Sequence, residues 1–292
     1  MHKITRESKQ VWRVIDILKW GEKYFAERAF ENARREIELL VQEVLNCKRV
    51  DLYLRYDEPL TKAQLSTLRD WIQRRIKHEP VQYITGRVGF HNILLNIVPG
   101  VLIPRPESEM LVETALRLVS KNPNASILDI GTGSGCIALA LAKALPEAQI
   151  IGIDNSGQAV ELSNLNAGKL QIANAEFQTF DILKDVMDKK FDIIVSNPPY
   201  IPKSDMDELM PEVRDFEPHS ALTDFDDGLT FYRKFVEISK QMLKPNGWFV
   251  LEVGLGNHPE LVNNLFVKNH FKEVELIKDY NGDWRVLIAR MK

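Results

Sequence analysis

The residues best suited to chemistry are Asn197-Pro198-Pro199-Tyr200, which follow an apolar run at residues 191–195. Two successive prolines fix two φ angles, remove two N–H donors and bias the preceding residue toward an extended backbone. A turn that only ends a strand would use the same prolines. However, this Asn-Pro-Pro-Tyr loop (residues 197–200) also offers the Asn197 carboxamide, unpaired carbonyls and the flat face of Tyr200. We therefore expect Asn197, Pro198, Pro199 and Tyr200 to bind a planar group with N–H donors, such as a primary amide or an exocyclic base amine.

A glycine-rich turn further upstream predicts a nucleotide-like ligand. The strand pattern of residues 127–130 is followed by a glycine loop (residues 131–135), made of Gly131, Thr132, Gly133, Ser134 and Gly135. Glycines tolerate positive φ and close approach by a ligand, and the N–H groups of a following helix would point at that ligand. A dinucleotide fingerprint requires its third glycine at position 136, where this chain has Cys136, so the pattern argues against NAD.

An acidic residue supports the same interpretation. Asp154 ends a second strand pattern that begins at Gln149, about 20 residues beyond the glycine loop. At that position a carboxylate can accept hydrogen bonds from both hydroxyls of a ribose. The combination favours a nucleoside-containing ligand over the alternative, a tight turn with no ligand.

Length and composition are those of an ordinary globular enzyme. The 292 residues are 45% hydrophobic and 27% charged, no apolar run approaches the roughly 20 residues of a membrane span, and the first residues carry no signal-peptide core. We therefore expect a cytoplasmic protein without membrane association. The two cysteines, Cys47 and Cys136, lie in different predicted elements, so neither a disulfide framework nor a cysteine-based metal site is expected.

Charge is divided unevenly along the chain. Residues 1–80 hold 17 basic and 13 acidic side chains, for a net +4, whereas residues 81–292 hold 21 and 28, for a net −7. Phosphate contacts supply much of the affinity for nucleic acids, so an acidic second part favours a protein or small amide as partner and no direct nucleic-acid binding. The basic cluster Arg74, Arg75 and Lys77 would either meet an acidic partner or form a solvated helix face.

Hydrophobic patterning divides the chain into two domains and a connector. Residues 1–80 are predicted to form a small helical bundle, with a capping box at Thr61 and Gln64. Residues 81–105 are predicted to be a hairpin-like connector. Strand and helix patterns alternate over residues 106–292, which predicts an α/β, doubly wound domain with a mostly parallel, seven-stranded sheet. Asn281-Gly282 separates the last two strand patterns and predicts an antiparallel edge hairpin.

These elements resemble the class I S-adenosylmethionine-dependent methyltransferases, and further short strings narrow the resemblance to the N5-glutamine methyltransferases of peptide chain release factors. The resemblance covers nearly the whole chain from about residue 30 onward. The glycine loop and the Asn-Pro-Pro-Tyr loop are shared with several other methyltransferases. The Arg-Pro-Glu-Ser-Glu segment (residues 105–109) is closer to diagnostic of the release factor enzymes. The strings are Pro80-Val81-Gln82-Tyr83-Ile84-Thr85-Gly86, Leu102-Ile103-Pro104-Arg105-Pro106-Glu107-Ser108-Glu109, Ser196-Asn197-Pro198-Pro199-Tyr200-Ile201, Glu217-Pro218 with Ala221-Leu222, Asp227-Gly228-Leu229 and Leu251-Glu252-Val253-Gly254.

The resemblance implies methyl transfer from S-adenosyl-L-methionine to the side-chain nitrogen (N5) of a glutamine in a release factor, with the helical domain helping to recognise that protein. It implies that the glycine loop holds the methionine portion of the donor, that Asp154 holds the ribose, and that Asp181 with Ile182 lies near the adenine. The Asn197 oxygen, which also lies near the donor, and the Pro198 carbonyl would accept the two N–H bonds of the acceptor amide. Tyr200 would pack beside the amide plane.

Two positions depart from the family pattern, and one segment stays open. Ser108 stands where the family more often has threonine, which keeps the hydroxyl, and Ile182 stands where an aromatic residue can flank the adenine. Arg105, Pro106 and Glu107 would either cover the donor or form an ordinary helix entry with Pro106 in its first turn.

Two other functions are compatible with the same residues. A nucleic-acid methyltransferase would use the Asn-Pro-Pro-Tyr loop for the exocyclic amine of a flipped base, of the adenine N6 or guanine N2 type, and would need a basic channel. An inactive donor-binding module is the third possibility, against which the intact loop argues. The fold alone does not choose among them.

Overall fold

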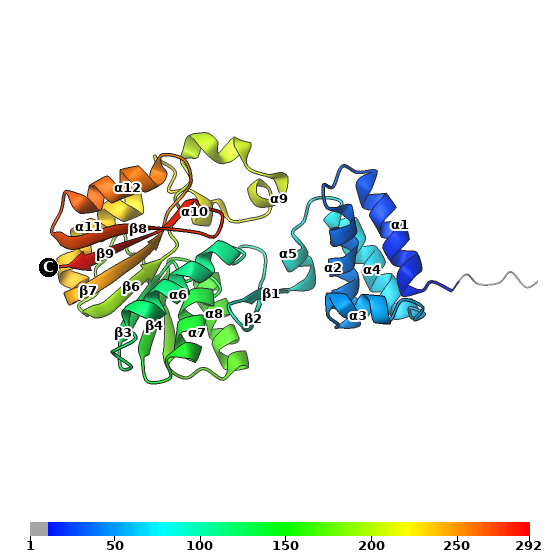
Figure 1. Cartoon of the computed structure of the whole chain (residues 1–292), viewed down its shortest axis with the longest axis horizontal. Helices are drawn as coiled ribbons and strands as arrows, with labels where there is room; N and C mark the ends of the chain where they lie inside the picture. The colour runs from blue at the N-terminus through cyan, green and yellow to red at the C-terminus, as the bar shows by residue number, and fades with distance from the viewer. Residues whose placement is uncertain (1–10) are drawn as a thin grey trace, which may run out of the picture. The chain divides into compact units, whose positions relative to one another are not determined.

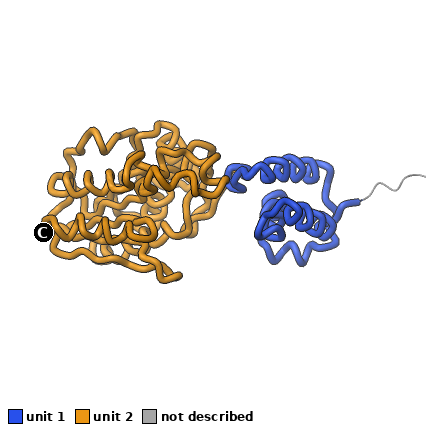
Figure 2. The backbone as a smooth tube through the Cα atoms, turned by 90° about the horizontal axis from the view of Figure 1, so that it is seen from above, with its two compact units in different colours: residues 1–85 blue, residues 86–292 orange. Residues whose placement is uncertain are grey.

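The structure is a computed structural model that describes residues 11–292, and the chain forms two compact units, residues 1–85 and 86–292 (Figure 2). The boundary falls inside the segment 81–105 that the sequence predicts to be a connector. Within the described residues, no helix has the length and apolar character needed to cross a membrane.

The first unit is helical, as predicted. Its helices are α1 (Val14–Ala26), α2 (Ala33–Leu45), α3 (Arg49–Leu54), α4 (Lys62–Arg75) and α5 (Val81–Thr85). The first four enclose one apolar core, in which the side chains of Phe25, Ile37 and Leu40 are fully buried. The predicted capping box at the start of α4 is present, because the Thr61 side chain accepts from the Gln64 N–H and the Gln64 side chain accepts from the Thr61 N–H.

Two details of this unit differ from the sequence-based expectations. Residues 81–85, expected to belong to an extended connector, form the short helix α5 and group with the helical unit. The basic cluster is also not a solvated face: Arg75 is buried and bound to Glu36, and Arg74 is bound to Glu79. Of the three, only Lys77 is exposed, and the charges of the other two are neutralised by nearby carboxylates.

The second unit begins with a small hairpin and continues as an α/β domain. Strands β1 (Arg87–Phe90) and β2 (Ile93–Asn96) form the hairpin. The main sheet has the order β5-β4-β3-β6-β7-β9-β8 (Figure 1). Its strands are β3 (Ser126–Ile130), β4 (Gln149–Asp154), β5 (Ala175–Thr179), β6 (Phe191–Ser196), β7 (Leu243–Glu252), β8 (Phe271–Lys278) and β9 (Trp284–Met291).

The sheet is parallel from β5 to β7, and β9 runs antiparallel to both β7 and β8. This confirms the prediction of a mostly parallel seven-stranded sheet with an antiparallel edge hairpin. Because the chain proceeds from β3 outward to β4 and β5 and then returns to β6 on the other side of β3, the strand order reverses between β3 and β6. Ligands of open α/β sheets bind outside the carboxyl ends of the strands at such a reversal.

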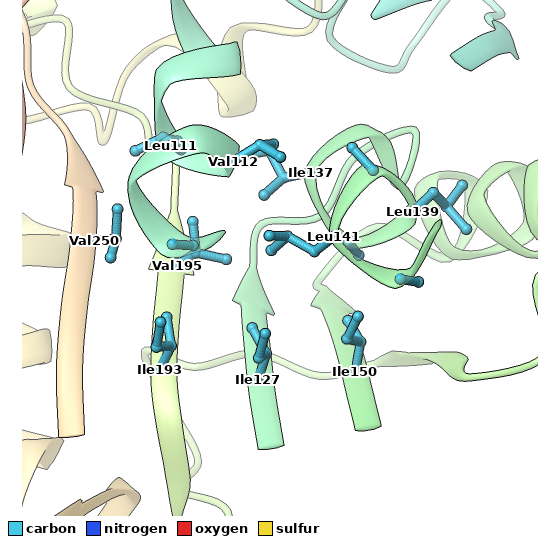
Figure 3. Packing of buried hydrophobic residues seen from close by; sticks show 14 of the residues in the cluster. Leu111, Val112, Ile127, Ile137, Leu139, Leu141, Ile150, Ile193, Val195 and Val250 are labelled. Carbon is cyan, nitrogen blue, oxygen red and sulfur yellow. The ribbon is translucent and has the colours of Figure 1, made fainter. Parts of the chain in front are cut away.

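Helices cover both faces of the sheet. One face carries α6 (Glu109–Leu118), α7 (Cys136–Ala144) and α8 (Gly157–Leu170), and the other carries α11 (Thr230–Met242) and α12 (His258–Val267). Successive strand residues alternate between the two cores: Ile193 and Val195 pack toward α6 and α7 (Figure 3), whereas Ile194 packs on the opposite side. This period of two fixes which side chains reach each layer.

The remaining helical elements are short. A 3₁₀ turn, η1 (Pro106–Ser108), precedes α6, and η2 (Lys203–Glu208), α9 (Pro211–Arg214) and α10 (His219–Leu222) lie between β6 and α11. The segment that contains them starts with the Asn-Pro-Pro-Tyr loop, so these turns extend the carboxyl edge of the sheet.

Close packing of α1 on α2 yields a stability prediction. At Gly21 an added Cβ would lie 2.3 Å from Ile37 Cγ1 and 2.8 Å from Ile37 Cβ. We expect Gly21→Ala to lower the unfolding free energy of the helical unit by about 1–3 kcal/mol, because the two helices must separate. Hydrogen exchange of peptides from α1 and α2 in the full chain measures the effect.

Gly157→Ala is the matched control. Gly157 begins α8, an added Cβ there meets nothing within 4 Å, and its φ is not in the left-handed region. This variant should be neutral or more stable by about 0.4–1 kcal/mol. Equal exchange rates in the wild type and the Gly21→Ala variant would contradict the tight contact.

Candidate active site

A pocket lies outside the carboxyl ends of β3, β4 and β6 and brings most of the predicted ligand-binding residues together. Its lining includes the predicted residues Gly131, Thr132, Gly133, Ser134, Asp154, Asp181, Ile182, Asn197 and Pro199. Of the other predicted residues, Gly135 caps α7, Pro198 is buried, and Tyr200 lines a neighbouring pocket. The Asn-Pro-Pro-Tyr loop therefore borders two pockets. We call the first the donor pocket and the one beside Tyr200 the second pocket.

The glycine loop has the conformation that the sequence predicts. Gly131, Gly133 and Gly135 have φ of +73°, +55° and +81°, a region that side chains disfavour. At Gly135 an added Cβ would also lie 2.9 Å from the Ser163 Cβ. Ser134 Oγ, in contrast, is buried and has no hydrogen-bond partner within the described residues. The hydroxyl is therefore enclosed in the protein, although Ser134 is a lining residue of the pocket.

Asp154 joins the glycine loop to the start of α8. Its Oδ2 accepts from the Gly133 N–H at 2.9 Å and its Oδ1 accepts from the Ser156 N–H at 2.9 Å. Burial raises the pKa of this carboxyl, while the two backbone donors favour its ionised form. Each carboxylate oxygen keeps one more lone-pair site, so Asp154 can still accept two hydroxyl groups from a ligand.

Sequence reasoning missed a second acid beneath the loop. Asp129 is fully buried, and its Oδ2 accepts from Thr132 Oγ1 at 2.7 Å and from the Ala138 N–H at 3.2 Å. Burial raises the pKa of Asp129 to about 7. An acid inside the apolar strand pattern of residues 127–130 is the signal that could have revealed this support of the loop.

The far wall of the donor pocket is formed by the segment after β5. Ile182 is buried, and Asp181 binds Lys184 at 2.8 Å, which lowers the pKa of the Asp181 carboxyl. Phe180 also lines the pocket. It supplies an aromatic side chain two residues before Ile182, and the sequence analysis did not consider it.

Residues 105–107 were expected either to cover the donor or to form a helix entry, and the structure divides them between the two. Arg105 lines the donor pocket, whereas Pro106 and Glu107 are not among its lining residues and form the 3₁₀ turn η1. Glu217 holds the segment, because its carboxylate accepts from Arg105 at 2.5 Å and from the Ile103 N–H at 3.2 Å. Burial raises the pKa of Glu217, and Arg105 opposes that shift. The helix-entry interpretation therefore fits Pro106 and Glu107.

In the Asn-Pro-Pro-Tyr loop, the two predicted acceptor oxygens differ in their position relative to the pocket. Asn197 Nδ2 donates to Ser108 Oγ at 3.0 Å, so one edge of the carboxamide is fixed. Neither Asn197 Oδ1 nor the Pro198 carbonyl accepts a hydrogen bond from the described part of the chain. Asn197 lines the donor pocket, whereas Pro198 is buried and lines neither pocket, so the Asn197 oxygen is the acceptor that an incoming N–H donor meets there.

Tyr200 is enclosed by residues from three other segments. Its hydroxyl donates to Glu252 Oε1 at 3.2 Å, and its ring lies 5.8 Å from the His258 ring. An added Cβ at Gly254 would lie 3.1 Å from Tyr200 Cδ2, and one at Gly228 would lie 2.3 Å from the Tyr200 carbonyl oxygen. The two glycines thus let their loops pack closely on Tyr200, which gives a physical reason for glycine at both positions.

His258, at the start of α12, connects these two glycine loops. Its Nδ1 accepts from the Gly254 N–H at 3.0 Å, so its Nε2 must carry the proton that reaches the Gly228 carbonyl at 3.2 Å. Burial lowers the pKa of His258, which keeps the ring neutral. Two other histidines, His91 and His219, line neither pocket.

Comparisons with known proteins find matches to both units of the chain. The PrmC N-terminal domain model matches residues 16–86, and the methyltransferase small domain model matches residues 107–212, which include both loops. The release factor glutamine methyltransferase of Geobacter sulfurreducens is 42% identical over 98% of this chain and 99% of its own length. That of Thermodesulfovibrio yellowstonii is 41% identical over 88% of this chain and 92% of its own.

The chain belongs to the release factor glutamine methyltransferase family. Among solved structures, the 16S rRNA N2 G1207 methyltransferase of T. thermophilus, in complex with AdoMet and guanosine, superposes with a TM-score of 0.51 at 20% identity. The match covers 70% of this chain and 50% of the rRNA enzyme, and it shows a shared fold. Because an rRNA enzyme has the same fold, the acceptor of this family member has to be argued from its site.

The hydrogen bonds of His258 predict its protonation. We expect the neutral Nε2–H tautomer and a pKa below the ordinary histidine value of 6.5, because the Nδ1 position is occupied by an N–H donor and the ring is buried. Long-range ¹H–¹⁵N NMR of the full chain, with His258→Asn to assign the signal, measures both properties. A dominant Nδ1–H tautomer would contradict the assigned bonds.

Proposed function

We propose that this protein transfers the methyl group of S-adenosyl-L-methionine to the side-chain amide nitrogen of a glutamine in a peptide chain release factor, in the cytoplasm. Family membership supports the reaction class. The observation that carries the acceptor assignment is the Asn197 side-chain oxygen, which belongs to a lining residue of the donor pocket and accepts no hydrogen bond within the described residues. The Pro198 carbonyl follows it in the chain and would be the second acceptor of the pair. A primary amide has the two N–H donors that such a pair requires.

The donor pocket fits S-adenosylmethionine. The positive-φ glycines allow a ligand to approach the backbone of the glycine loop. Asp154 has lone pairs left for ribose hydroxyls, and Phe180 with Ile182 supplies an apolar wall for the base. When bound, the donor supplies an activated sulfonium methyl group and a leaving group that is neutral at sulfur.

The chain's own contribution is positioning and electrostatics. An amide nitrogen is a weak nucleophile because its lone pair is delocalised into the carbonyl. Asn197 Oδ1 and the Pro198 carbonyl would hold both N–H bonds, direct the nitrogen toward the donor pocket and stabilise positive charge as it grows on nitrogen. Tyr200 would limit movement of the amide out of this orientation.

A strong general base is not required by this arrangement. The nitrogen becomes acidic only as the new bond forms, and water can then take the proton. Burial and the nearby Glu252 carboxylate raise the pKa of Tyr200, so its phenol stays protonated and acts as a hydrogen-bond donor. His258 is engaged at both ring nitrogens.

The helical unit is assigned to substrate recognition in this proposal. A release factor is a folded protein, and a separate compact unit provides contact area beyond the amide itself. The match of residues 16–86 to a domain model of the same family supports the assignment.

The decisive experiment offers the purified full chain and radiolabelled S-adenosylmethionine a release factor, ribosomal protein, tRNA and duplex DNA in separate reactions. We expect label on a single glutamine of the release factor, located by mass spectrometry of its peptides. A release factor with that glutamine changed to alanine is the control. Label on tRNA or DNA instead would overturn the proposed acceptor.

Variants of the two loops should affect different steps. We expect Asn197→Ala to lower kcat by about 10²–10³-fold, as for loss of a transition-state hydrogen-bonding group, with donor affinity close to wild type. Asp154→Ala should weaken donor binding by about 10- to 100-fold, since hydrogen bonds to a charged acceptor are worth about 1.5–3 kcal/mol. Calorimetric donor titration and methylation kinetics separate the two effects.

Asn164→Ala is the matched control for the asparagine variant. Asn164 is an exposed residue of α8 whose side chain bonds only to the Val160 carbonyl within the described chain. The Asn164→Ala variant should leave both kcat and donor affinity unchanged. Equal losses of donor affinity in Asn197→Ala and Asp154→Ala would contradict the separate roles.

A further inference from the structure

A continuous chain of hydrogen bonds joins the two ends of the Asn-Pro-Pro-Tyr loop through residues outside it. Asn197 Nδ2 donates to Ser108 Oγ at 3.0 Å, and Ser108 Oγ donates to Glu252 Oε2 at 2.5 Å. The Tyr200 hydroxyl donates to the other carboxylate oxygen of Glu252. Ser108 ends η1 and Glu252 ends β7, so the loop is fastened to two separate elements of the unit.

We propose that Ser108 and Glu252 are positioning residues for methyl transfer, which orient the Asn197 carboxamide so that its oxygen faces the acceptor nitrogen and which hold Tyr200 in place. This inference rests on the proposed function and adds two residues that would act through Asn197 and Tyr200. Ser108 is also a lining residue of the donor pocket, so donor affinity is measured for each variant.

The direction of the bonds follows from counting donors and acceptors. An ionised Glu252 carboxylate only accepts, so the hydroxyls of Ser108 and Tyr200 must both donate to it. Since the single proton of Ser108 is then used, Ser108 Oγ can only accept from Asn197, and the group facing it must be the Asn197 NH₂. The Asn197 oxygen is consequently on the other side of the planar carboxamide.

Burial makes this orientation costly to reverse. Ser108 is 2% exposed and Glu252 is 1% exposed, so water offers little compensation for a broken bond. If Asn197 turned over, its oxygen would face Ser108 Oγ, whose only proton points to Glu252, and two acceptors would oppose each other. Successive hydrogen bonds also polarise one another, which makes Asn197 Oδ1 a better acceptor for the amide of a substrate.

The charge state of Glu252 depends on groups from several elements. Burial raises its pKa to about 7; bonds from Ser108 and Tyr200 and the charge of Arg285 on β9 lower it, and Glu107 of η1 raises it. A protonated Glu252 would itself donate one hydrogen bond, so one of the two hydroxyls could no longer donate to it. The ordered arrangement therefore requires the ionised form, which predominates above about pH 7.

If Ser108 and Glu252 only stabilised the fold, their loss would lower stability and donor affinity together with kcat. Substitutions at Ser108 separate this structural role from the proposed positioning role. Ser108→Ala removes the hydroxyl that links Asn197 to Glu252, whereas Ser108→Thr keeps a hydroxyl at this position. Ser239→Ala is the control: Ser239 is also a fully buried serine, and its hydroxyl bonds to Val236 and His270 on the opposite face of the sheet. Each variant is compared with wild type for donor affinity by calorimetry and for kcat and KM on a full-length release factor.

We expect Ser108→Ala to lower kcat by about 10- to 100-fold, with donor affinity and thermal midpoint close to those of Ser239→Ala, because the amide is misplaced while the fold remains. Ser108→Thr should restore most of kcat. A kcat for Ser108→Ala equal to that of Ser239→Ala, or failure of threonine to restore activity, would overturn the proposal. So would a loss of donor affinity as large as the loss of kcat.

Glu252→Gln supplies an independent readout. Wild-type kcat should rise with pH as Glu252 ionises, at or below the value of about 7 that holds without the donor, because a bound sulfonium lowers the pKa of a nearby carboxyl. Glu252→Gln should have a lower kcat without this rise, because glutamine must donate toward Ser108 or Tyr200. A rise that persists unchanged in Glu252→Gln would contradict the role of Glu252.

An acceptor-independent measurement keeps this inference separate from the proposed function. If wild type labels no release factor, the proposed function fails, and crystal structures of the donor-bound variants still test the positioning. Asn197 should keep its bond to residue 108 in Ser108→Thr and shift or turn in Ser108→Ala. An unchanged Asn197 in Ser108→Ala would refute the positioning role whatever the acceptor.

Discussion

The whole site depends on one constraint: the carboxyl ends of five neighbouring parallel strands meet at one edge of the sheet. The glycine loop follows β3, Asp154 ends β4, the segment with Asp181 follows β5, the Asn-Pro-Pro-Tyr loop follows β6, and Glu252 ends β7. Both faces of the sheet are covered, so a one-residue slip of any strand would exchange its two sets of buried side chains. The apolar cores therefore fix the register that places the polar residues.

Local patterns were enough to predict the order of helices and strands, the Thr61 capping box and the pocket-lining residues that lie at strand ends. These features depend on neighbouring residues: glycines at fixed spacing, a proline pair, an acid after an apolar run. The short helix α5 and the pairing of Arg75 with Glu36 were not predicted, since both depend on how segments pack. The roles of Ser108 and Glu252 were also inaccessible, because these residues are 144 positions apart. The family resemblance pointed to the strings that contain them but not to their contact.

Glycine is used at this site for close packing as well as for turns. Gly228 and Gly254 lie against Tyr200, and Gly152 allows the Phe177 ring to lie where a Cβ would come within 2.5 Å of it. Phe177 and Ser163 in turn pack against the glycine loop at Gly135. The segments around both pockets are thus in backbone-level contact with each other. Such contacts limit small displacements of the loops, and positioning catalysis is sensitive to displacements of about 1 Å.

Buried carboxyl groups explain why an acidic count along the sequence overstates the charge of the surface. Asp129, Glu217 and Glu252 all contribute to the net −7 of residues 81–292, yet all three are buried around the site and have hydrogen-bond donors. Burial disfavours their charge, as the raised pKa values of all three indicate. A positively charged sulfonium donor would favour their ionised forms, since an opposite charge nearby lowers a carboxyl pKa. In the proposed reaction, donor binding and the ordering of the Ser108–Glu252 hydrogen bonds would therefore reinforce each other, because both are favoured by the same ionised Glu252.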